Sequence, residues 1–481
     1  MTLNFRESLW MLAGITAIMV TGIFIIEMPI SVILLLEAIF AGIVGSVKKI
    51  PYSVIQESVT TAISGILVPI IILLLIGALV ASWIMSGTVP ALICIGLKAI
   101  DAEFFLIISF LMCSLTSMII GTSWGTISTL GIAFMGISNA LGLSPIYTVS
   151  TIVSGAILGD KMSPLSSSVV LACQLTDTTS IGSMKAAAAT NLPSFIVSAV
   201  IYILLGMSSA DQPVSQASEA SDLLKAISGQ FDVGIITLLP PALLITLILL
   251  KIPTIPAFMA GIAAGVLEAL FIQNHNASDV FEGLLSGYAY GDDPSVNDLL
   301  NYGGIDSMAS ILTLLIFAAA FGGIIKKLGL IACLLDKIFN DSKSRIRIIT
   351  SSVIIHTVCF VITGNYYATN SILAPALNSI YEKNGISRSH ITSIFLDTGT
   401  GISPLVPWSA TAIFVSGTLG YSSLNYCLYA PILWLPLFFF PFVGHSGAAS
   451  SFVSFGSLIL ETQRRALNVI YDLLLLIPKA T

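Results

Sequence analysis

Long apolar runs recur along almost the whole of this 481-residue chain, and they constrain its fold more than any other feature. Residues 10–26 and 66–85 are two examples. A helical run of about 18 apolar residues or more is long enough to cross a bilayer. Only 9% of the residues are charged, whereas soluble domains carry roughly 25%. The mean hydropathy is +0.99. The chain is therefore predicted to be an all-α polytopic membrane protein with about 11–13 spans.

The charges between the apolar runs predict the topology. Cytoplasmic loops are enriched in Lys and Arg, which places Lys48-Lys49, Lys326-Lys327 and the N-terminus on the cytoplasmic side of the cell membrane. The loop 273–307 holds six acidic residues and neither Lys nor Arg, so we expect it outside. No basic patch indicates a nucleic-acid partner. The lipid bilayer is the expected environment, and the sequence leaves a homodimer open.

The six cysteines lie in or beside apolar segments and form neither a CxxC motif nor a cluster with histidine. They are predicted to be small buried hydrophobic residues rather than metal ligands or disulfides, and no cofactor is expected. The first apolar run lacks a basic start and a small-residue cleavage site. It is therefore interpreted as a membrane anchor and not as a removed signal peptide.

Two halves of similar length are predicted from an internal repeat. Gly121 matches Gly364 at a shift of 243 positions, and Ser163-Pro164-Leu165 matches Ser403-Pro404-Leu405 at a shift of 240. Duplicated units with Gly/Pro-broken apolar segments at matching positions are typical of secondary transporters. The predicted organisation is a first transmembrane half at 1–207, a polar linker at 208–232, a second half at 233–443 and an amphipathic tail at 444–481.

Polar clusters bracket apolar sequence in both halves and predict the functional site. Charged and polar residues inside a membrane segment are costly, so they usually face a cavity or the bundle interior. Unwound backbone and hydroxyl groups can bind Na+ in such proteins, and a carboxylate can exchange a proton for a cation. The candidate ion- or substrate-binding residues are Thr122, Ser123, Thr126, Asp160, Ser163, Asn365, Thr369, Asp397, Thr400 and Ser403, with Na+ expected at Asp160 and Asp397. Lys161 and Trp408 are expected to support them.

Each of these residues also has a structural interpretation. Lys161 could be a counter-charge to Asp160 or could extend to the membrane interface. Asp397 could cap a broken helix, the hydroxyls could join helices, and Trp408 could be a packing residue. Gly121 to Gly125 also fits the G-x-S-x-G pattern of serine hydrolases, but an apolar helix and not a strand is predicted before it. We therefore expect no enzyme.

Several of these strings resemble the NhaC family of Na+/H+ antiporters. The similarity is carried by Gly121 to Gly125, by Gly159-Asp160-Lys161-Met162-Ser163-Pro164-Leu165-Ser166, and by Ser403-Pro404-Leu405-Val406-Pro407-Trp408. The family includes sodium/proton antiporters and malate/lactate antiporters. The resemblance implies two inverted repeats, with re-entrant hairpins and broken helices around a site near the membrane midplane.

The sequence departs from the family pattern at three places. Ser167-Ser168-Val169-Val170 stands where the family usually has Asp-Thr-Thr-Asn, Asn365 stands where it has Asp, and Ser409-Ala410 replaces Asn-Thr. A site with fewer acids should attract cations less. Two transport hypotheses therefore remain open: Na+/H+ antiport, and exchange of a small organic acid of the malate or lactate type coupled to Na+ or H+. A non-transporting membrane protein is the third.

Overall fold

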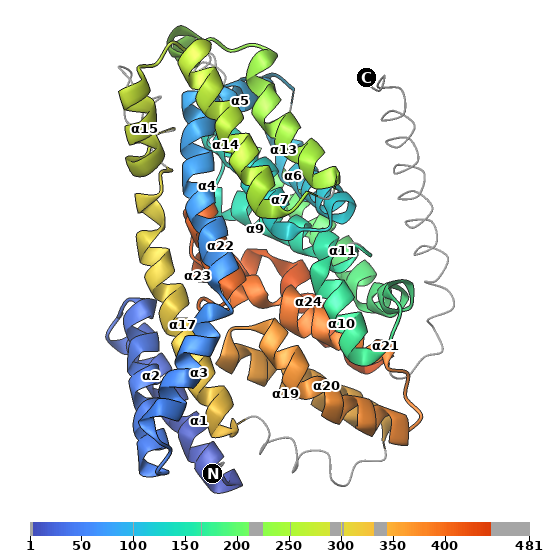
Figure 1. Cartoon of the computed structure of the whole chain (residues 1–481). Helices are drawn as coiled ribbons and strands as arrows, with labels where there is room; N and C mark the ends of the chain where they lie inside the picture. The colour runs from blue at the N-terminus through green and yellow to red at the C-terminus, as the bar shows by residue number, and fades with distance from the viewer. Residues whose placement is uncertain are drawn as a thin grey trace, which may run out of the picture.

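The computed structural model describes residues 3–99, 101–164, 166–210, 225–250, 252–288, 300, 303–330 and 344–443. Within these ranges the regular structure is helical (Figure 1). The predicted linker lies largely outside the described residues, and the predicted amphipathic tail lies wholly outside them.

The helices of the first half are α1 (Phe5–Val20), η1 (Thr21–Ile25), α2 (Ile30–Val47), α3 (Tyr52–Ser64), α4 (Leu67–Met85), α5 (Thr88–Ala99), α6 (Ala102–Ile120), α7 (Ser123–Thr126), η2 (Ile127–Gly131), α8 (Ile132–Ala140), α9 (Pro145–Lys161), α10 (Ser167–Thr176) and α11 (Ser180–Ala210). Those of the second half are η3 (Ile236–Leu238), α13 (Leu239–Leu249), α14 (Thr254–Phe271), α15 (Ala277–Ser286), η4 (Asp306–Met308), α17 (Ala309–Leu328), α19 (Arg345–Thr363), α20 (Tyr366–Lys383), α21 (Ser389–Phe395), η5 (Leu396–Gly401), η6 (Ser403–Leu405), α22 (Ala410–Leu419), α23 (Ser423–Tyr426), η7 (Cys427–Tyr429) and α24 (Pro431–Val443).

Seven helices in the described part of the chain are long and apolar enough to cross a membrane, and up to nine spans result if each of two bent helix pairs counts as one. The bent pairs join Ser389–Leu405 to Ala410–Leu419 at 40° and Ser423–Tyr429 to Pro431–Phe440 at 58°. The chain is therefore a multi-pass membrane protein with broken helices, as its composition predicts. The predicted number of spans also included shorter segments such as α1 and α9, and it stays a prediction.

The same series of elements occurs in both halves. The α6 helix ends at Gly121 and α19 ends at Gly364, and both glycines adopt the left-handed conformation, with φ of 80° and 60°. This conformation favours glycine because it has no Cβ. Thr122 and Asn365 then cap the next helices by accepting hydrogen bonds from Gly125 N and Ala368 N. The repeat predicted from sequence thus corresponds to matching local structure, whereas the inverted orientation of the two series stays a prediction.

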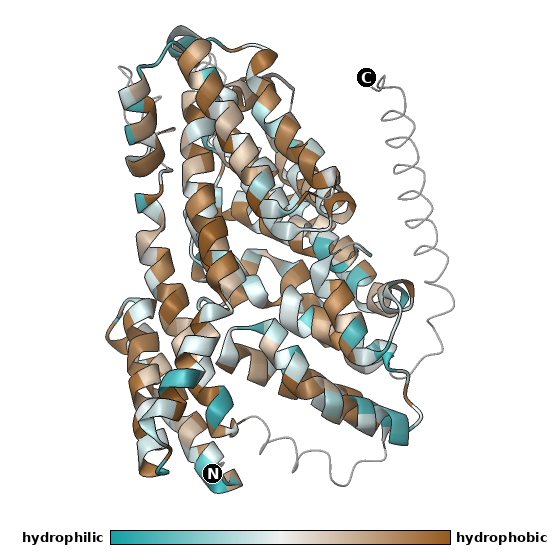
Figure 2. Cartoon of the chain, viewed as in Figure 1, coloured by the Kyte–Doolittle hydropathy of each residue, from teal (hydrophilic) through white to brown (hydrophobic). Residues whose placement is uncertain are grey.

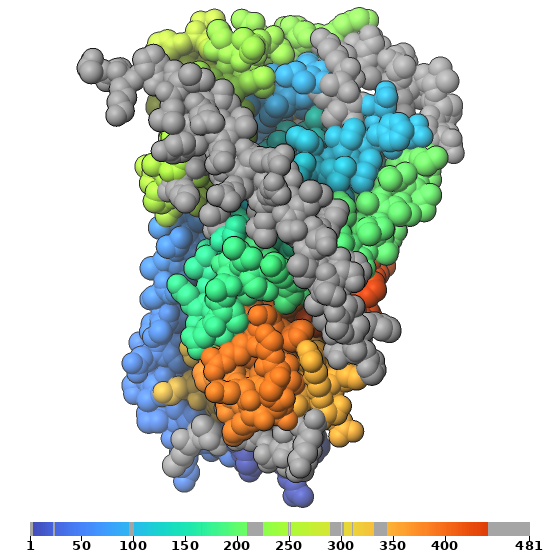
Figure 3. All heavy atoms as spheres, turned by 90° about the vertical axis from the view of Figure 1, so that its right-hand side faces the viewer, coloured from blue at the N-terminus to red at the C-terminus, as the bar shows by residue number. Residues whose placement is uncertain are grey.

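The two halves pack across each other. The α2 helix lies along α17 of the second half, and α14 lies along α4 of the first half (Figure 1). Near the lower end of the molecule, α10 packs against α20 and α21, and Figure 3 shows these segments side by side on one face. Each half therefore completes the apolar packing of the other.

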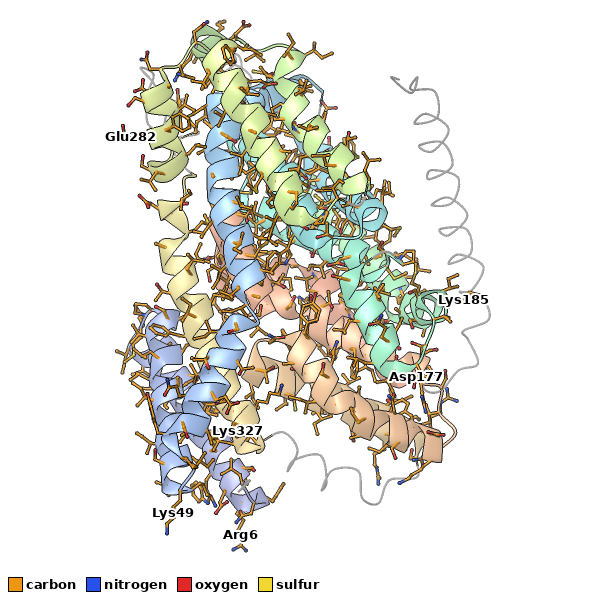
Figure 4. The ribbon with its side chains drawn as sticks, viewed as in Figure 1. Arg6, Lys49, Asp177, Lys185, Glu282 and Lys327 are labelled. Carbon is orange, nitrogen blue, oxygen red and sulfur yellow. The ribbon has the colours of Figure 1, made fainter. Side chains whose placement is uncertain are left out.

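Charge and hydropathy follow the axis of the helices. Hydrophobic residues run along the helices, and hydrophilic residues are frequent at the two ends of the molecule (Figure 2). Arg6, Lys49 and Lys327 lie at the end that holds the N-terminus, and Glu282 lies at the opposite end (Figure 4). This separation fits the topology expected from the charge bias of the loops.

The closest helix contact that positions the site joins α9 to α6. A Cβ atom at Gly155 would lie 2.5 Å from Phe110 O, and one at Gly159 would lie 2.4 Å from Ser114 O. Ser117 also donates a hydrogen bond of 2.6 Å to Ala156 O. Small residues four positions apart let membrane helices approach closely, and here they fix the end of α9 against α6.

We predict that Gly159→Ala lowers the free energy of unfolding by about 1–3 kcal/mol, because the added methyl group meets backbone atoms that cannot move independently. Thermal unfolding in detergent, followed by tryptophan fluorescence, measures the change. Gly42→Ala on α2 is the matched control, since no atom lies within 4 Å of a Cβ built there. Equal melting temperatures for the two variants would contradict this account of the packing.

Candidate functional site

Two helix breaks lie at the centre of the packed halves. In the first half α9 ends at Lys161, and α10 begins at Ser167. In the second half the π-helical turn η5 leads through η6 to α22. Pro164 and Pro404 stand in these breaks, and a proline cannot donate the backbone hydrogen bond that a continuous helix needs. The breaks expose polar backbone at positions where the surrounding protein can satisfy it.

Asp160 lies in the last turn of α9 and is buried, with 8% of its surface exposed. Its Oδ2 atom accepts a hydrogen bond of 2.7 Å from the Ser123 hydroxyl and a longer one of 3.4 Å from Ser123 N. Its Oδ1 atom accepts a hydrogen bond from the Ser166 hydroxyl. The described residues offer it hydroxyl and N–H donors but no cationic side chain.

Helix ends explain part of this arrangement. A carboxylate at a helix C-terminus is unfavourable, whereas one at an N-terminus is favourable. Asp160 belongs to the end of α9, but it contacts Ser123 in the first turn of α7 and Ser166, the N-cap of α10. The break therefore places the carboxylate where two helices begin.

Asp397 lies in η5 and is fully buried. The Lys161 Nζ atom lies 3.0 Å from Asp397 Oδ1, and both side chains are 0% exposed. Two residues of α11 complete the shell: Thr190 donates to Oδ2 at 2.7 Å, and Asn191 Nδ2 donates to Oδ1 at 2.9 Å. A buried ion pair is tolerable only with such additional hydrogen bonds.

This pairing corrects both sequence interpretations of Lys161. The residue does not extend to the membrane interface, because it is fully buried. Its partner is Asp397 of the other half and not its neighbour Asp160. The side chain has room because a glycine faces it: a Cβ atom at Gly401 would lie 3.2 Å from Lys161 Nζ.

The other predicted site residues lie at the breaks or at the two helix starts. Thr126 donates to Thr122 O at 3.2 Å in α7, and Thr369 contacts the hydroxyl of Thr363 at 2.7 Å in α20. Ser403 donates to Thr400 O at 2.8 Å. The Thr400 hydroxyl is buried and makes no hydrogen bond within the described structure. Ser163, also buried, stands in the first break.

Trp408 is a packing residue beside the second break. Its ring nitrogen donates to Val361 O at 2.6 Å, and its Cδ1 atom lies 2.9 Å from a Cβ built at Gly364. It borders a cavity of 1120 Å³ between α3, α17 and the starts of α20 and α22. Among its described lining residues, three are basic, Lys49, Lys326 and Lys327, and one is acidic, Glu57.

Sequence reasoning did not identify Thr190, Asn191 or the surroundings of His356 as parts of the site. The His356 ring contacts Asn370 Oδ1 at 2.8 Å and the Thr398 hydroxyl at 2.6 Å, next to Asp397. It does not form a pair with Ser123, whose hydroxyl donates to Asp160. Among the described residues, no histidine is hydrogen-bonded to the serine of the G-x-S-x-G string, as a serine nucleophile would need.

The chain is similar in sequence to a known family of proteins. Residues 155–446 match the model of the Na+/H+ antiporter family. The Na(+)/H(+) antiporter NhaC of Alkalihalophilus pseudofirmus is 30% identical over 442 residues, which cover 92% of this chain and 95% of that protein. The malate-2H(+)/Na(+)-lactate antiporter of Bacillus subtilis is 29% identical over 85% of this chain and 87% of its own length. The arginine/ornithine antiporter ArcD of Halobacterium salinarum is 26% identical over 89% of this chain and 88% of its own length.

We predict that Lys161→Met and Asp397→Leu, each made alone and measured in Na+-free buffer, lower the free energy of unfolding by about 3–5 kcal/mol, because each leaves an unpaired buried charge. The double variant should lose clearly less than the sum of the two. A double-mutant cycle of thermal unfolding in detergent measures this coupling. Additive losses would show that the two side chains do not stabilise each other.

Proposed function

The chain belongs to the Na+/H+ antiporter family, and from that premise we propose that it is a secondary active transporter that exchanges Na+ for H+ across the cell membrane. We further propose that its N-terminus faces the cytoplasm, because the end of the molecule that holds it carries Arg6, Lys49 and Lys327.

The environment of Asp160 carries this proposal. A carboxylate that is buried with hydroxyl donors and no cationic partner can be neutralised by a proton or by a metal cation. Ser123 and Ser166 direct oxygen atoms to the same place, and oxygen is the ligand that hard cations prefer. The carboxylate can therefore hold Na+ and H+ alternately but not together. This mutual exclusion is what couples the two fluxes.

The break between α9 and α10 supplies the conformational element of the proposal. Broken helices around a central site let one part of a transporter move against the other while the site stays between them. Asp160 belongs to α9, and its ligands belong to α7 and to the N-cap of α10. A relative shift of these three segments would open the site towards one side of the membrane.

A second candidate function is exchange of a small organic acid, coupled to Na+ or H+. The large cavity favours it, because three lysines and one glutamate would attract an anion more than a cation. Asn365, which caps α20, also lines the cavity, and helix N-termini favour carboxylates. A relative of 29% identity is named for malate and lactate. An exchanger of Na+ and H+ alone needs no cavity of this volume.

We predict that added Na+ moves protons across proteoliposomes containing the wild-type protein and that Asp160→Asn abolishes this movement, because the amide cannot exchange a proton for a cation. A pH-sensitive dye inside the vesicles records the flux. Asp177→Asn is the matched control: Asp177 is the C-cap of α10, at the other end of that helix from Ser166, and Arg388 pairs with it at the surface. It should retain the wild-type rate.

The same vesicles separate the two candidate functions. A response to Na+ alone supports Na+/H+ exchange, whereas a response only when malate or lactate is present supports organic-acid exchange. Wild-type activity of Asp160→Asn would remove Asp160 from either mechanism.

A further inference from the structure

We propose that Na+ competes with the Lys161 ammonium group for Asp397, and that Lys161 gives up its proton when Na+ takes its place. This inference rests on the proposed Na+/H+ exchange and extends it, because it assigns a proton carrier and a second cation site. The site consists of Asp397 with Thr190 and Asn191 of α11.

The geometry of Asp397 already holds a cation. Lys161 Nζ is a cationic group 3.0 Å from Asp397 Oδ1 in a place with no exposed surface. The Lys161 side chain extends from α9, in the other half of the chain, and lies against Gly401. The remaining neighbours of the carboxylate, Thr190 and Asn191, belong to a third segment. Among the described residues that contact the carboxylate, the ammonium is therefore the one that a cation could replace without leaving the carboxylate charge uncompensated.

Two buried oxygen atoms, one on a residue that already contacts Asp397 and one on η5, fit such a replacement. The Asn191 Oδ1 atom has no hydrogen-bond donor within the described structure, and its residue is 1% exposed. The Thr400 hydroxyl, three residues after Asp397, is also unpaired there and 3% exposed. A buried acceptor without a donor is destabilising, and both atoms are oxygen ligands of the kind that hard cations prefer. The Thr190 hydroxyl can rotate to present a lone pair as well.

The exchange balances in charge and in protons. Na+ binds Asp397, the N–H bond of Lys161 breaks with its electron pair staying on nitrogen, and the proton leaves to water. One positive charge enters and one departs. A buried ammonium group without a counter-charge is strongly disfavoured, so the loss of Asp397 as its partner favours the neutral amine.

The described charged and titratable groups around Lys161 come from four elements. Asp160 precedes it on α9, Asp397 lies opposite on η5, and His356 of α19 and Tyr366 of α20 both lie against η5. Asp160 is the one group that could take over the ammonium as a counter-charge. If it did, Lys161 would keep its proton, and the experiments below distinguish that outcome.

The first experiment measures thermal unfolding in detergent with NaCl or choline chloride. We expect Lys161→Met to melt at a lower temperature than wild type in choline, and Na+ to raise its melting temperature by about 5 °C more than that of wild type, because the ion fills the vacated position. Lys161→Met/Asp397→Asn, which keeps Asp160, should lose this additional rise. Lys185→Met, an exposed lysine on α11, is the control and should respond to Na+ as wild type does. An equal Na+ response in Lys161→Met and wild type would overturn the proposal.

The second experiment uses Lys161→Arg, which keeps a positive charge beside Asp397 but cannot give up a proton at working pH. Na+-driven proton movement in proteoliposomes should fall clearly below that of the wild-type protein, because only the exchange at Asp160 remains. A wild-type rate of proton movement in this variant would show that Lys161 does not carry the proton. That result would also be expected if Lys161 kept its proton by pairing with Asp160. If the wild-type protein moved no protons in response to Na+, the proposed function would fail, whereas the melting experiment would still test the cation site.

Discussion

The buried pair of Lys161 and Asp397 is the interaction on which the centre of the structure depends. Its two members come from different halves of the chain and have no exposed surface. In a low-dielectric interior, neither charge is tolerable alone. The pair therefore holds the end of α9 against η5, and the hydrogen bonds from Thr190 and Asn191 bring α11 to the same point. The α9, α11 and η5 segments thus meet at the Asp397 carboxylate, which needs a counter-charge and hydrogen-bond donors.

The two halves repeat their local structure but not their chemistry. At the shift that aligns the two Ser-Pro pairs, Asp160 corresponds to Thr400 and Lys161 to Gly401. The glycine leaves the space that the lysine side chain occupies. The break in the first half thus holds an acid and a base, Asp160 and Lys161. The break in the second half holds a hydroxyl group and a residue without a side chain, Thr400 and Gly401. Asp397, one turn before Thr400, supplies the missing charge. This asymmetry leaves Asp160 without a cationic partner among the described residues, as the proposed exchange at that carboxylate requires.

The sequence was sufficient to predict the membrane class, the broken helices and the matching polar clusters, because these follow from local composition and from Gly and Pro positions. It could not assign the partner of Lys161, since that pairing depends on how the halves pack. Thr190 and Asn191 stand between an alanine-rich stretch and an apolar one, so neither cluster spacing nor charge distinguished them. At Ser167 to Val170 the usual Asp-Thr-Thr-Asn of the family is absent, and the Ser168 hydroxyl is hydrogen-bonded there to Ser166, which contacts Asp160.

The most direct test of the account is whether Na+ binding itself releases protons. Purified protein in weakly buffered, Na+-free detergent solution would be mixed with NaCl, and a pH dye would record the change against a choline chloride control. We expect acidification in the wild-type protein, and none in a variant that combines Asp160→Asn with Lys161→Met. Saturable Na+ binding without proton release would contradict it, because the two ions would then not compete for the same groups.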